Sequence, residues 1–430
     1  MRKLDTKTYK LASIPIISGL LIAIATFSSW WFVQLIAFVA LAPLFVVMKL
    51  VNPKHYYFFG LLFFAAWLLP TTYWYYNFMP WWLAVLASVG FVTLIANVFH
   101  LFSLSVSKKV SYPVALVCVI VAWVAFTWLR IRLPVSEDWW IPHLGYAAWH
   151  NSGVLQTAHF GGEVTVEAVV LLANAAIALA YIYGNKYRSA IVSLAIICIV
   201  SASNLLILSR SSAPLPNVIS LQQMTTGGVD VPATNVDITL LIKNSAEALK
   251  QAPSNKPTVV VWPENSIPVE LQEQIKQFAS SARIFIVYHT VEKVSDKTYK
   301  KVVVLDDSGK ELLRNYKQHI APGEIGDSNH SDNSAQINDW LVTTYACYDM
   351  HYPDSVRRIG NADIVFVPIN DAAFGTLQRN FHAADLAFRA VQTNATIVSS
   401  STNGPTVYID EWGVKRRDLP YSSNGSIMLF

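Results

Sequence analysis

The sequence has 430 residues, of which 53% are hydrophobic and 14% are charged. Its net charge of +4 is small and gives no indication of a nucleic-acid partner. The charged residues are unevenly distributed: 18 Asp, Glu, Lys and Arg residues lie in positions 1–210 and 42 lie in positions 211–430. The first half is too poor in charge for an ordinary soluble domain. The composition therefore predicts a membrane domain over 1–210 and a globular domain over 211–430.

Long apolar runs fill the first 210 residues. A membrane-spanning helix needs about 20 apolar residues. We predict a bundle of about seven spanning helices, at 11–29, 31–50, 56–77, 81–106, 112–131, 165–184 and 189–209. The first run follows a basic segment, as in a signal peptide, but it has no clear cleavage site, so we expect it to be retained as a span.

Positive charge is concentrated at alternate ends of the predicted spans. Lysines and arginines precede the first span and follow the second, fourth and sixth, namely Arg2, Lys3, Lys7, Lys10, Lys49, Lys54, Lys108, Lys109, Lys186 and Arg188. Because positively charged loops stay in the cytoplasm, the N-terminus is predicted to be cytoplasmic. An odd number of spans then places the globular domain outside the cytoplasm. Glu163 and Glu167, which flank the sixth span, are expected to be solvated.

The second half alternates β-branched runs with amphipathic stretches, which predicts an α/β or layered α+β architecture. Strands are predicted at 217–223, 258–263, 283–289, 301–306, 341–347, 363–368, 396–401 and 406–410. Helices are predicted at 236–252, 268–281 and 376–393. Turn residues at 306–309 and 410–413 indicate hairpins. The polar segment 323–339 is typical of a long loop.

Three reactive side chains follow apolar runs of this half. Glu264, Lys317 and Cys347 each lie just past a strand-like run, so all three could converge at one sheet edge. The thiolate of Cys347, the only cysteine of this half, would attack a carbonyl carbon after Glu264 takes its proton. Lys317 would favour the thiolate and, with the backbone N–H of Tyr348, stabilise an oxyanion. Each residue type alone is more often structural, so it is the ordered set that indicates a nucleophilic enzyme.

The ordered motifs Trp262-Pro263-Glu264, Tyr316-Lys317 and Cys347-Tyr348-Asp349 resemble those of the carbon–nitrogen hydrolase (nitrilase) superfamily. The resemblance implies an αββα sandwich in which Glu264 is the general base, Lys317 stabilises charge and Cys347 is the nucleophile. The preceding spans narrow the resemblance to bacterial apolipoprotein N-acyltransferases. Further matches are Ala42-Pro43-Leu44, Asn370-Asp371-Ala372, Phe374-Gly375, Arg389-Ala390, Thr402-Asn403-Gly404 and Asp410.

That family moves an acyl chain from a phospholipid to the N-terminal amine of S-diacylglyceryl-cysteine lipoproteins, through a cysteine thioester. The resemblance therefore implies a phospholipid donor, a lipoprotein acceptor, a membrane environment, and neither a cofactor nor a metal. It also implies a monomer of the bacterial cytoplasmic (inner) membrane whose catalytic domain lies on the periplasmic side. The family carries a second glutamate shortly after its lysine, and Glu324 is the candidate for that position.

The sequence departs from the family pattern at several places. Asp349 stands where a glutamate is usual, Ala373 where a tryptophan is usual, and Gln392 where a glutamate is usual. The family also has a further span after this domain, which would lie beyond Phe430. These departures leave the three reactive residues intact and bear on the identity of the acyl acceptor.

Two other functions compete with acyl transfer. One is a membrane-bound nitrilase-type amidase that acts on a small carbon–nitrogen substrate with water as acceptor. The multi-span bundle disfavours it, because a simple tether needs one span. The other is not enzymatic: a lipid-binding relative without activity, or a channel-like bundle that carries a sensor domain. The presence of Glu264, Lys317 and Cys347 argues against a relative without activity, and the lack of a central charged residue in the predicted spans argues against an ion path.

Overall fold

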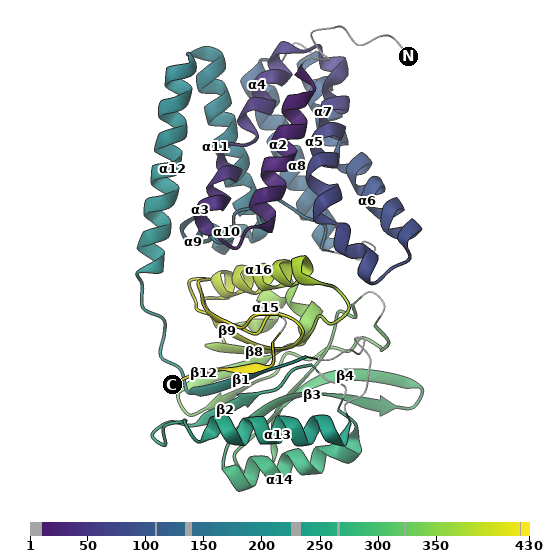
Figure 1. Cartoon of the computed structure of the whole chain (residues 1–430), viewed down its shortest axis with the longest axis vertical. Helices are drawn as coiled ribbons and strands as arrows, with labels where there is room; N and C mark the ends of the chain where they lie inside the picture. The colour runs from purple at the N-terminus through teal and green to yellow at the C-terminus, as the bar shows by residue number, and fades with distance from the viewer. Residues whose placement is uncertain are drawn as a thin grey trace. The chain divides into compact units, whose positions relative to one another are not determined.

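The computed structural model describes residues 11–107, 110–133, 140–224, 234–264, 267–321, 324–421 and 423–430. The chain divides into two compact units, Met1–Arg210 and Ser211–Phe430 (Figure 1). Among the residues named above, Arg2, Lys3, Lys7, Lys10, Lys108 and Lys109 lie outside the described ranges.

The first unit consists of apolar helices, which occupy all seven ranges named as spans. They are α2 (Ser13–Phe27), α3–η1–α4 (Trp31–Gln34, Leu35–Phe38 and Ala42–Leu50), α5 (Tyr56–Thr71), α6–α7 (Trp81–Ile95 and Asn97–Ser107), α8 (Tyr112–Arg132), α11 (Glu163–Tyr183) and α12 (Lys186–Leu208). Short helical turns join them: η2 (Pro53–His55), η3 (Tyr73–Asn77), α9 (Ser152–Leu155) and α10 (Ala158–Gly161). Within the described residues, 5 helices are long and apolar enough to cross a membrane. Since α2 has only 15 residues and α5 only 16, seven crossings stay a prediction.

The second apolar segment is interrupted between η1 and α4. Pro43 stands in the first turn of α4, where its missing N–H needs no partner. The backbone groups freed at the break do need partners, because lipid offers none. Asn174 of α11 supplies them: its Oδ1 accepts from the N–H groups of Leu41 (2.8 Å) and Ala42 (3.0 Å), and its Nδ2 donates to the Ala37 carbonyl (2.8 Å). One side chain thus fixes both sides of the break to α11.

Glu163 and Glu167 are buried, with 2% and 0% of their surface exposed, so the prediction that they are solvated is wrong. Glu167 Oε1 accepts hydrogen bonds from Trp123 Nε1 (3.2 Å) and the Leu144 N–H (3.1 Å). Residues 140–150 therefore turn back into the unit and cover this end of α11. The Glu167 carboxylate thus connects α11 with α8 and with the segment between these two helices.

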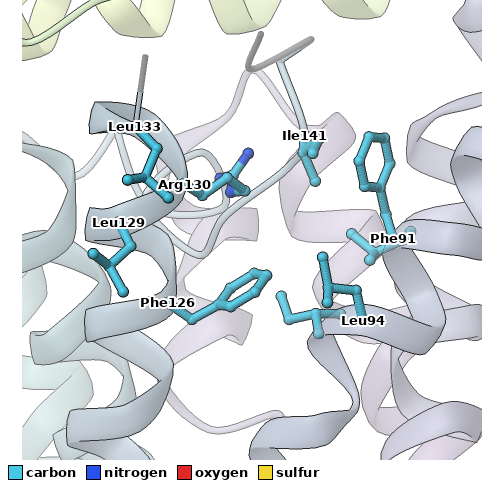
Figure 2. A pocket seen from close by; sticks show the side chains of 9 residues that line it. Phe91, Leu94, Phe126, Leu129, Arg130, Leu133 and Ile141 are labelled. Carbon is cyan, nitrogen blue, oxygen red and sulfur yellow. The ribbon is translucent and has the colours of Figure 1, made fainter. Parts of the chain in front are cut away.

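The first unit contains an apolar cavity of about 290 Å³. Figure 2 shows Phe126 and Leu129 of α8 on one side of it and Phe91 and Leu94 of α6 on the other. The full lining is Leu68, Phe91, Leu94, Ile95, Phe126, Leu129, Arg130, Leu133 and Ile141. Arg130 brings the single charged side chain to this otherwise apolar set.

The second unit is built on one continuous mixed sheet, with the strand order β5-β4-β3-β2-β1-β9-β8-β7-β6. The strands are β1 (Asn217–Gln223), β2 (Thr258–Val261), β3 (Phe285–Val294), β4 (Lys297–Leu305), β5 (Glu311–Tyr316), β6 (Ser334–Ile337), β7 (Trp340–Thr344), β8 (Ile364–Asn370), β9 (Thr396–Thr402), β10 (Val407–Ile409), β11 (Lys415–Asp418) and β12 (Gly425–Leu429). The helices are α13 (Asn235–Leu249), η4 (Val269–Leu271), α14 (Gln272–Ala282), η5 (Cys347–Met350), α15 (Ser355–Ile359) and α16 (Thr376–Thr393). The two halves of the sheet meet where β1 pairs with β9.

Alternating side chains of β2 reveal how the layers pack. Val259 and Val261 enter a core with Phe366 and other residues of β7, β8 and β9, so the two half-sheets lie face to face. Val260 points the other way, into a second core with Ile275 and other residues of α13 and α14. Helices α15 and α16 lie on the opposite outer face (Figure 1). The predicted αββα sandwich is confirmed.

Local pattern predicted the central elements better than the peripheral ones. The strand at 217–223 and the helix at 376–393 have the predicted bounds. Strands β5, β6, β11 and β12 were not predicted, and β6 lies inside the segment 323–339 that we expected to be a loop. β6 pairs antiparallel with β7, so pairing across the sheet, rather than an apolar pattern of its own, makes it a strand.

Replacing Asn174 with leucine tests the repair of the broken helix. The variant leaves the Leu41, Ala42 and Ala37 backbone groups without this partner inside the bundle, which should lower the free energy of unfolding by about 3 kcal/mol. Thermal unfolding of the purified protein in detergent measures the change. Asn97→Leu is the matched control, because Asn97 is exposed and bonds only within its own helix turn. Equal stability of the two variants would contradict this role of Asn174.

Candidate active site

Three strand ends bring the predicted reactive residues into the interior of the second unit. Glu264 follows β2, Lys317 directly follows β5, and Cys347 opens the turn η5 after β7. Backbone hydrogen bonds fix two of them: the Glu264 N–H donates to the Ile369 carbonyl (3.3 Å) and the Lys317 N–H donates to the Lys300 carbonyl (2.8 Å). All three side chains are almost completely buried.

The Lys317 ammonium stands between two carboxylates. Its Nζ lies 2.9 Å from Glu264 Oε1 and 2.8 Å from Glu324 Oε1. Glu324 Oε1 also accepts from Lys300 Nζ at 2.7 Å, and its Oε2 accepts from the Ala321 N–H at 2.8 Å. Two ammonium groups and two carboxylates therefore alternate in a space from which water is excluded, and their charges balance. Lys300 is a member of this network that sequence reasoning missed.

The network fixes the protonation of its members. Burial alone would raise the pKa of the Glu324 carboxyl, but Lys317 and Lys300 outweigh burial and lower it to about 2. Burial alone would lower the pKa of Lys317, but Glu264 and Glu324 raise it well above its usual value. At neutral pH, Glu324 is therefore an anion and Lys317 a cation.

Cys347 combines a strained backbone with a protonated thiol. Its φ of 42° lies in the left-handed region, which a residue with a Cβ rarely adopts and which occurs often at functional sites. Burial and the nearby Glu264 raise the pKa of the thiol well above its usual value, while Lys317 acts in the opposite direction with less effect. Cys347 therefore rests as a thiol, and its attack requires a base that takes the proton at that moment.

Helix α16 presents a stripe of buried polar side chains to the turn that carries Cys347. Gln378, His382, Asp385 and Arg389 follow one another at spacings of four, three and four residues, so they share one face of the helix. All four are at most 2% exposed. A polar stripe at helical spacing on a buried helix is the sequence signal that could have identified them, and of the four we had noted only Arg389, as part of a motif.

Each residue of the stripe contacts the loops around the nucleophile. Asp385 Oδ2 lies 2.7 Å from His351 Nδ1. Arg389 donates from Nε to the Met350 carbonyl (3.1 Å) and from Nη2 to the His351 carbonyl (2.9 Å). Arg389 is in turn hydrogen-bonded to Gln392 Oε1, so the amide that replaces the usual glutamate still holds this arginine. The helix thereby fixes the end of η5.

Asp349, another departure from the family pattern, connects the turn that carries Cys347 to the loop that follows Lys317. Its Oδ1 accepts from the N–H groups of Gln318 (3.0 Å) and His319 (2.9 Å), the two residues after Lys317. Arg358 Nη1 lies 3.4 Å from the same oxygen. The carboxylate next to the nucleophile thus positions the chain that delivers Lys317.

Tyr348 follows the nucleophile and packs against the same turn. Its ring stacks on His351 with centroids 5.5 Å apart, and its hydroxyl accepts from the Tyr352 hydroxyl at 3.2 Å. The backbone N–H of Tyr348 belongs to the peptide unit that begins at the Cys347 carbonyl, which places this donor beside the thiol.

One group of potential metal ligands lies at the nucleophile. Cys347, Asp371 and His382 offer donor atoms that all lie within 4.8 Å of one another. Both ring nitrogens of His382 already face hydrogen-bond partners, Asp371 and the Cys347 carbonyl. A metal ion would have to displace these bonds, so we assign the group to hydrogen bonding.

Family comparisons account for both units. Residues 219–413 match the carbon–nitrogen hydrolase family model, so the second unit belongs to the nitrilase-type enzymes. Residues 18–176 match the apolipoprotein N-acyltransferase N-terminal domain. With these two matches in this order, the chain is similar over most of its length to the apolipoprotein N-acyltransferases.

Two individual relatives are similar to most of the chain. The chain is 24% identical over 376 residues to the apolipoprotein N-acyltransferase of Allorhizobium ampelinum, covering 77% of this chain and 70% of the relative. It is 24% identical over 349 residues to that of Rhizobium etli, covering 70% and 64%. The chain thus spans about two thirds of the length of these relatives. Among solved structures, an amidase from Nesterenkonia sp. AN1 aligns with a TM-score of 0.42 and 15% identity, covering 51% of this chain and 92% of the amidase.

Replacing Lys300 with methionine removes one of the two cations that keep Glu324 ionised. The pKa of Glu324 should rise by at least about one unit. In the unmodified protein the lowered pKa keeps the Glu324 carboxylate charged until the pH falls toward about 2. In the variant Glu324 should take up a proton at a higher pH, so activity should be lost at a higher pH as the solution is acidified. A pH–activity profile measures the shift. Lys310→Met, in the exposed turn between β4 and β5, is the control, and an unchanged acid limit in Lys300→Met would contradict the role given to Lys300.

Proposed function

We propose that this protein is an apolipoprotein N-acyltransferase, which moves an acyl chain from a phospholipid to the N-terminal amine of an S-diacylglyceryl-cysteine lipoprotein. The observation that carries the proposal is the buried Glu264–Lys317–Glu324 network next to a thiol in a chain whose first unit is a bundle of apolar helices. The network suits attack on a carbonyl carbon, and the bundle suits a substrate that resides in a membrane.

The first half-reaction would transfer the acyl chain to the enzyme. The sulfur of Cys347 attacks the ester carbonyl carbon while Glu264 takes the thiol proton. The oxyanion that forms is stabilised by the Lys317 ammonium and the Tyr348 N–H. The bond to the glycerol oxygen then breaks, this oxygen takes the proton from Glu264, and a lysophospholipid leaves. The acyl chain remains as a thioester on Cys347.

The second half-reaction would return the enzyme to its starting state. The free amine of the lipoprotein attacks the thioester carbonyl, and Glu264 accepts a proton from the amine. The carbon–sulfur bond breaks, the amide is released, and the proton passes from Glu264 to the Cys347 sulfur. The burial of Glu264, Lys317 and Cys347 supports acyl transfer over hydrolysis, because a dry site disfavours attack by water on the thioester.

The cavity of the first unit supports a lipid as the acyl donor. Its walls are apolar apart from Arg130, and its volume of about 290 Å³ suits part of an acyl chain (Figure 2). Apolar side chains such as Phe126 and Leu94 bind methylene groups without a polar cost. A small amide substrate would need no such cavity.

The charges at the span ends support a location in the bacterial inner membrane, with the second unit on the periplasmic side. This location agrees with the acceptor, since lipoproteins carry their lipid in the membrane and their polypeptide outside the cytoplasm. We expect the protein to act as a monomer, because one chain holds all the residues given roles here.

Cys347→Ala should abolish formation of an acyl-enzyme. Incubation with phospholipid and no acceptor should add the mass of one acyl chain to the unmodified protein, as seen by intact-mass analysis, and no mass to the variant. The control is the double variant Cys118→Ser and Cys198→Ser, which should still acquire the acyl chain because these two cysteines lie in helices of the first unit.

The same preparation separates transfer from hydrolysis. Sustained release of lysophospholipid should require a diacylglyceryl-cysteine peptide with a free N-terminus. Sustained release of free fatty acid without this acceptor would identify a hydrolase. An adduct that persists in Cys347→Ala would place the nucleophile elsewhere.

Single cysteines test the orientation in a chain that lacks Cys118 and Cys198. Cys347 is buried, so exposed positions serve as reporters instead. They are Asp307→Cys, in the exposed β4–β5 turn, and Lys54→Cys, in the exposed turn after the second span. We expect a membrane-impermeant maleimide to label Asp307→Cys in intact spheroplasts and Lys54→Cys only after lysis. The reverse pattern would place the second unit in the cytoplasm.

A further inference from the structure

A second buried pair of charged groups lies beside the nucleophile, separate from the lysine network. His382, on α16, places Nδ1 at 2.9 Å from Asp371 Oδ2 and 3.2 Å from its Oδ1. Asp371 lies directly after β8, and neither side chain has any exposed surface. The reaction described above assigns no role to this pair, although it is completely removed from water.

The other nitrogen of the same ring faces the nucleophile's own backbone. His382 Nε2 lies 3.2 Å from the Cys347 carbonyl oxygen. A carbonyl oxygen and an ionised carboxylate are both acceptors and have no hydrogen to give. A ring that bonds to both therefore donates from both nitrogens, which makes His382 an imidazolium.

The surroundings of His382 agree with this protonation state. Burial lowers the pKa of His382, but Asp371 and, with less effect, Asp385 raise it by more, so the pKa lies above its usual value. Two further groups act on Asp371. Gln378 Nε2 lies 3.4 Å from its Oδ1, and the positive charge of Arg379 interacts electrostatically with its carboxylate.

Other titratable groups lie around the pair. Asp385 is itself bonded to His351, Tyr421 is influenced by the charge of Asp371, and the Cys347 thiol completes the set. The carboxylates of Asp371 and Asp385 favour the imidazolium.

The bond from His382 reaches the peptide unit that matters for oxyanion binding. The Cys347 carbonyl and the Tyr348 N–H are the two ends of one peptide group. A cation that donates to the carbonyl draws electron density toward it, which makes the N–H at the other end a stronger donor. The same bond holds a carbonyl whose residue has a φ of 42°, so it also stabilises a backbone conformation that strain would otherwise release.

We propose that His382, held by Asp371, is a positioning residue for acyl transfer: it fixes the strained Cys347–Tyr348 peptide and polarises the Tyr348 N–H toward the oxyanion. The proposal rests on the function given above for Cys347 and Tyr348. In this role His382 acts on the reaction through the Cys347–Tyr348 peptide group rather than by a contact with the substrate.

Acyl-enzyme formation in a single turnover tests the proposal without the acceptor, whose amine would titrate in the same pH range. His382→Gln keeps a side chain that can donate one hydrogen bond but carries no charge. We expect its acylation rate constant at saturating phospholipid to fall about tenfold to a hundredfold, less than the loss of a whole oxyanion donor. The phospholipid concentration for half-saturation should stay unchanged. His330→Gln is the matched control, because His330 forms a similar pair with Asp332 at 3.1 Å on the surface.

Asp371→Asn separates polarisation from simple structural support. Without the carboxylate, the pKa of His382 falls, so the ring should lose its charge as the pH rises through the neutral range. We expect this variant to acylate slowly at pH about 8 and to recover toward the unmodified rate at pH about 5.5, while the unmodified protein shows no such rise. Thermal unfolding at both pH values checks that the variant is folded.

Two results would overturn the proposal. One is a folded His382→Gln variant with an acylation rate within about twofold of the unmodified protein, which is too small for a polarised oxyanion donor. The other is an equal loss of rate in Asp371→Asn at every pH, which a structural role would produce.

Burst kinetics with p-nitrophenyl butyrate distinguish a failure of this proposal from a failure of the proposed function. If phospholipid gives no acyl-enzyme but the activated ester gives a His382-dependent burst, the lipid substrate is wrong and the role of His382 stands.

Discussion

The Lys317 ammonium, held between the carboxylates of Glu264 and Glu324, is the interaction on which the site of the second unit depends. All three side chains are at most 5% exposed, and a charge removed from water to this degree is stable only with partners at hydrogen-bond distance. The loss of any one of them would leave a buried charge without compensation. The ends of β2 and β5 are therefore held together by electrostatics as well as by the sheet, and the loop with Glu324 is held to both.

The two glutamates of this network differ in their lysine partners. Glu324 bonds to both Lys317 and Lys300, which fix it as an anion. Glu264 has Lys317 as its lysine partner, with His289 Nε2 at 3.7 Å from the same Oε1. Because Lys317 keeps its proton and Glu324 stays charged, the proposed reaction uses Glu264 as the member of the network that exchanges a proton with the thiol. The raised pKa of Cys347 fits the same logic, since the sulfur gives up its proton only in the step that uses it.

The sequence was sufficient for residues whose place follows from local pattern. Glu264, Lys317 and Cys347 each come just after an apolar run, and strand ends are where a sheet gathers functional side chains. Lys300 was beyond reach, because it lies in a run with Lys301 that looks like solvated charge. It is buried because β4 pairs with β5 and Glu324 then folds back over it, which are contacts distant in sequence. β6 escaped prediction for a related reason, since it depends on β7.

Helix α16 lies between these two cases, because its sequence contains a pattern of polar residues that could have been recognised. Gln378, His382, Asp385 and Arg389 repeat at helical spacing, and polar residues on a fully buried helix face need partners. The sequence alone predicts such a stripe, but not that its partners are Asp371, His351 and the turn that carries the nucleophile. Those partners come from β8 and η5, so only the folded sandwich brings them to the helix.

The departures from the family pattern concern this supporting layer rather than the reacting groups. Asp349, shorter by one methylene than the usual glutamate, still reaches the two N–H groups after Lys317. Gln392 still bonds to Arg389, although it brings no charge to that contact. Both side chains therefore hold parts of the chain that surround the site by hydrogen bonds. In the proposed reaction the position of Lys317 depends on the bonds of Asp349, so an aspartate at this position is compatible with acyl transfer.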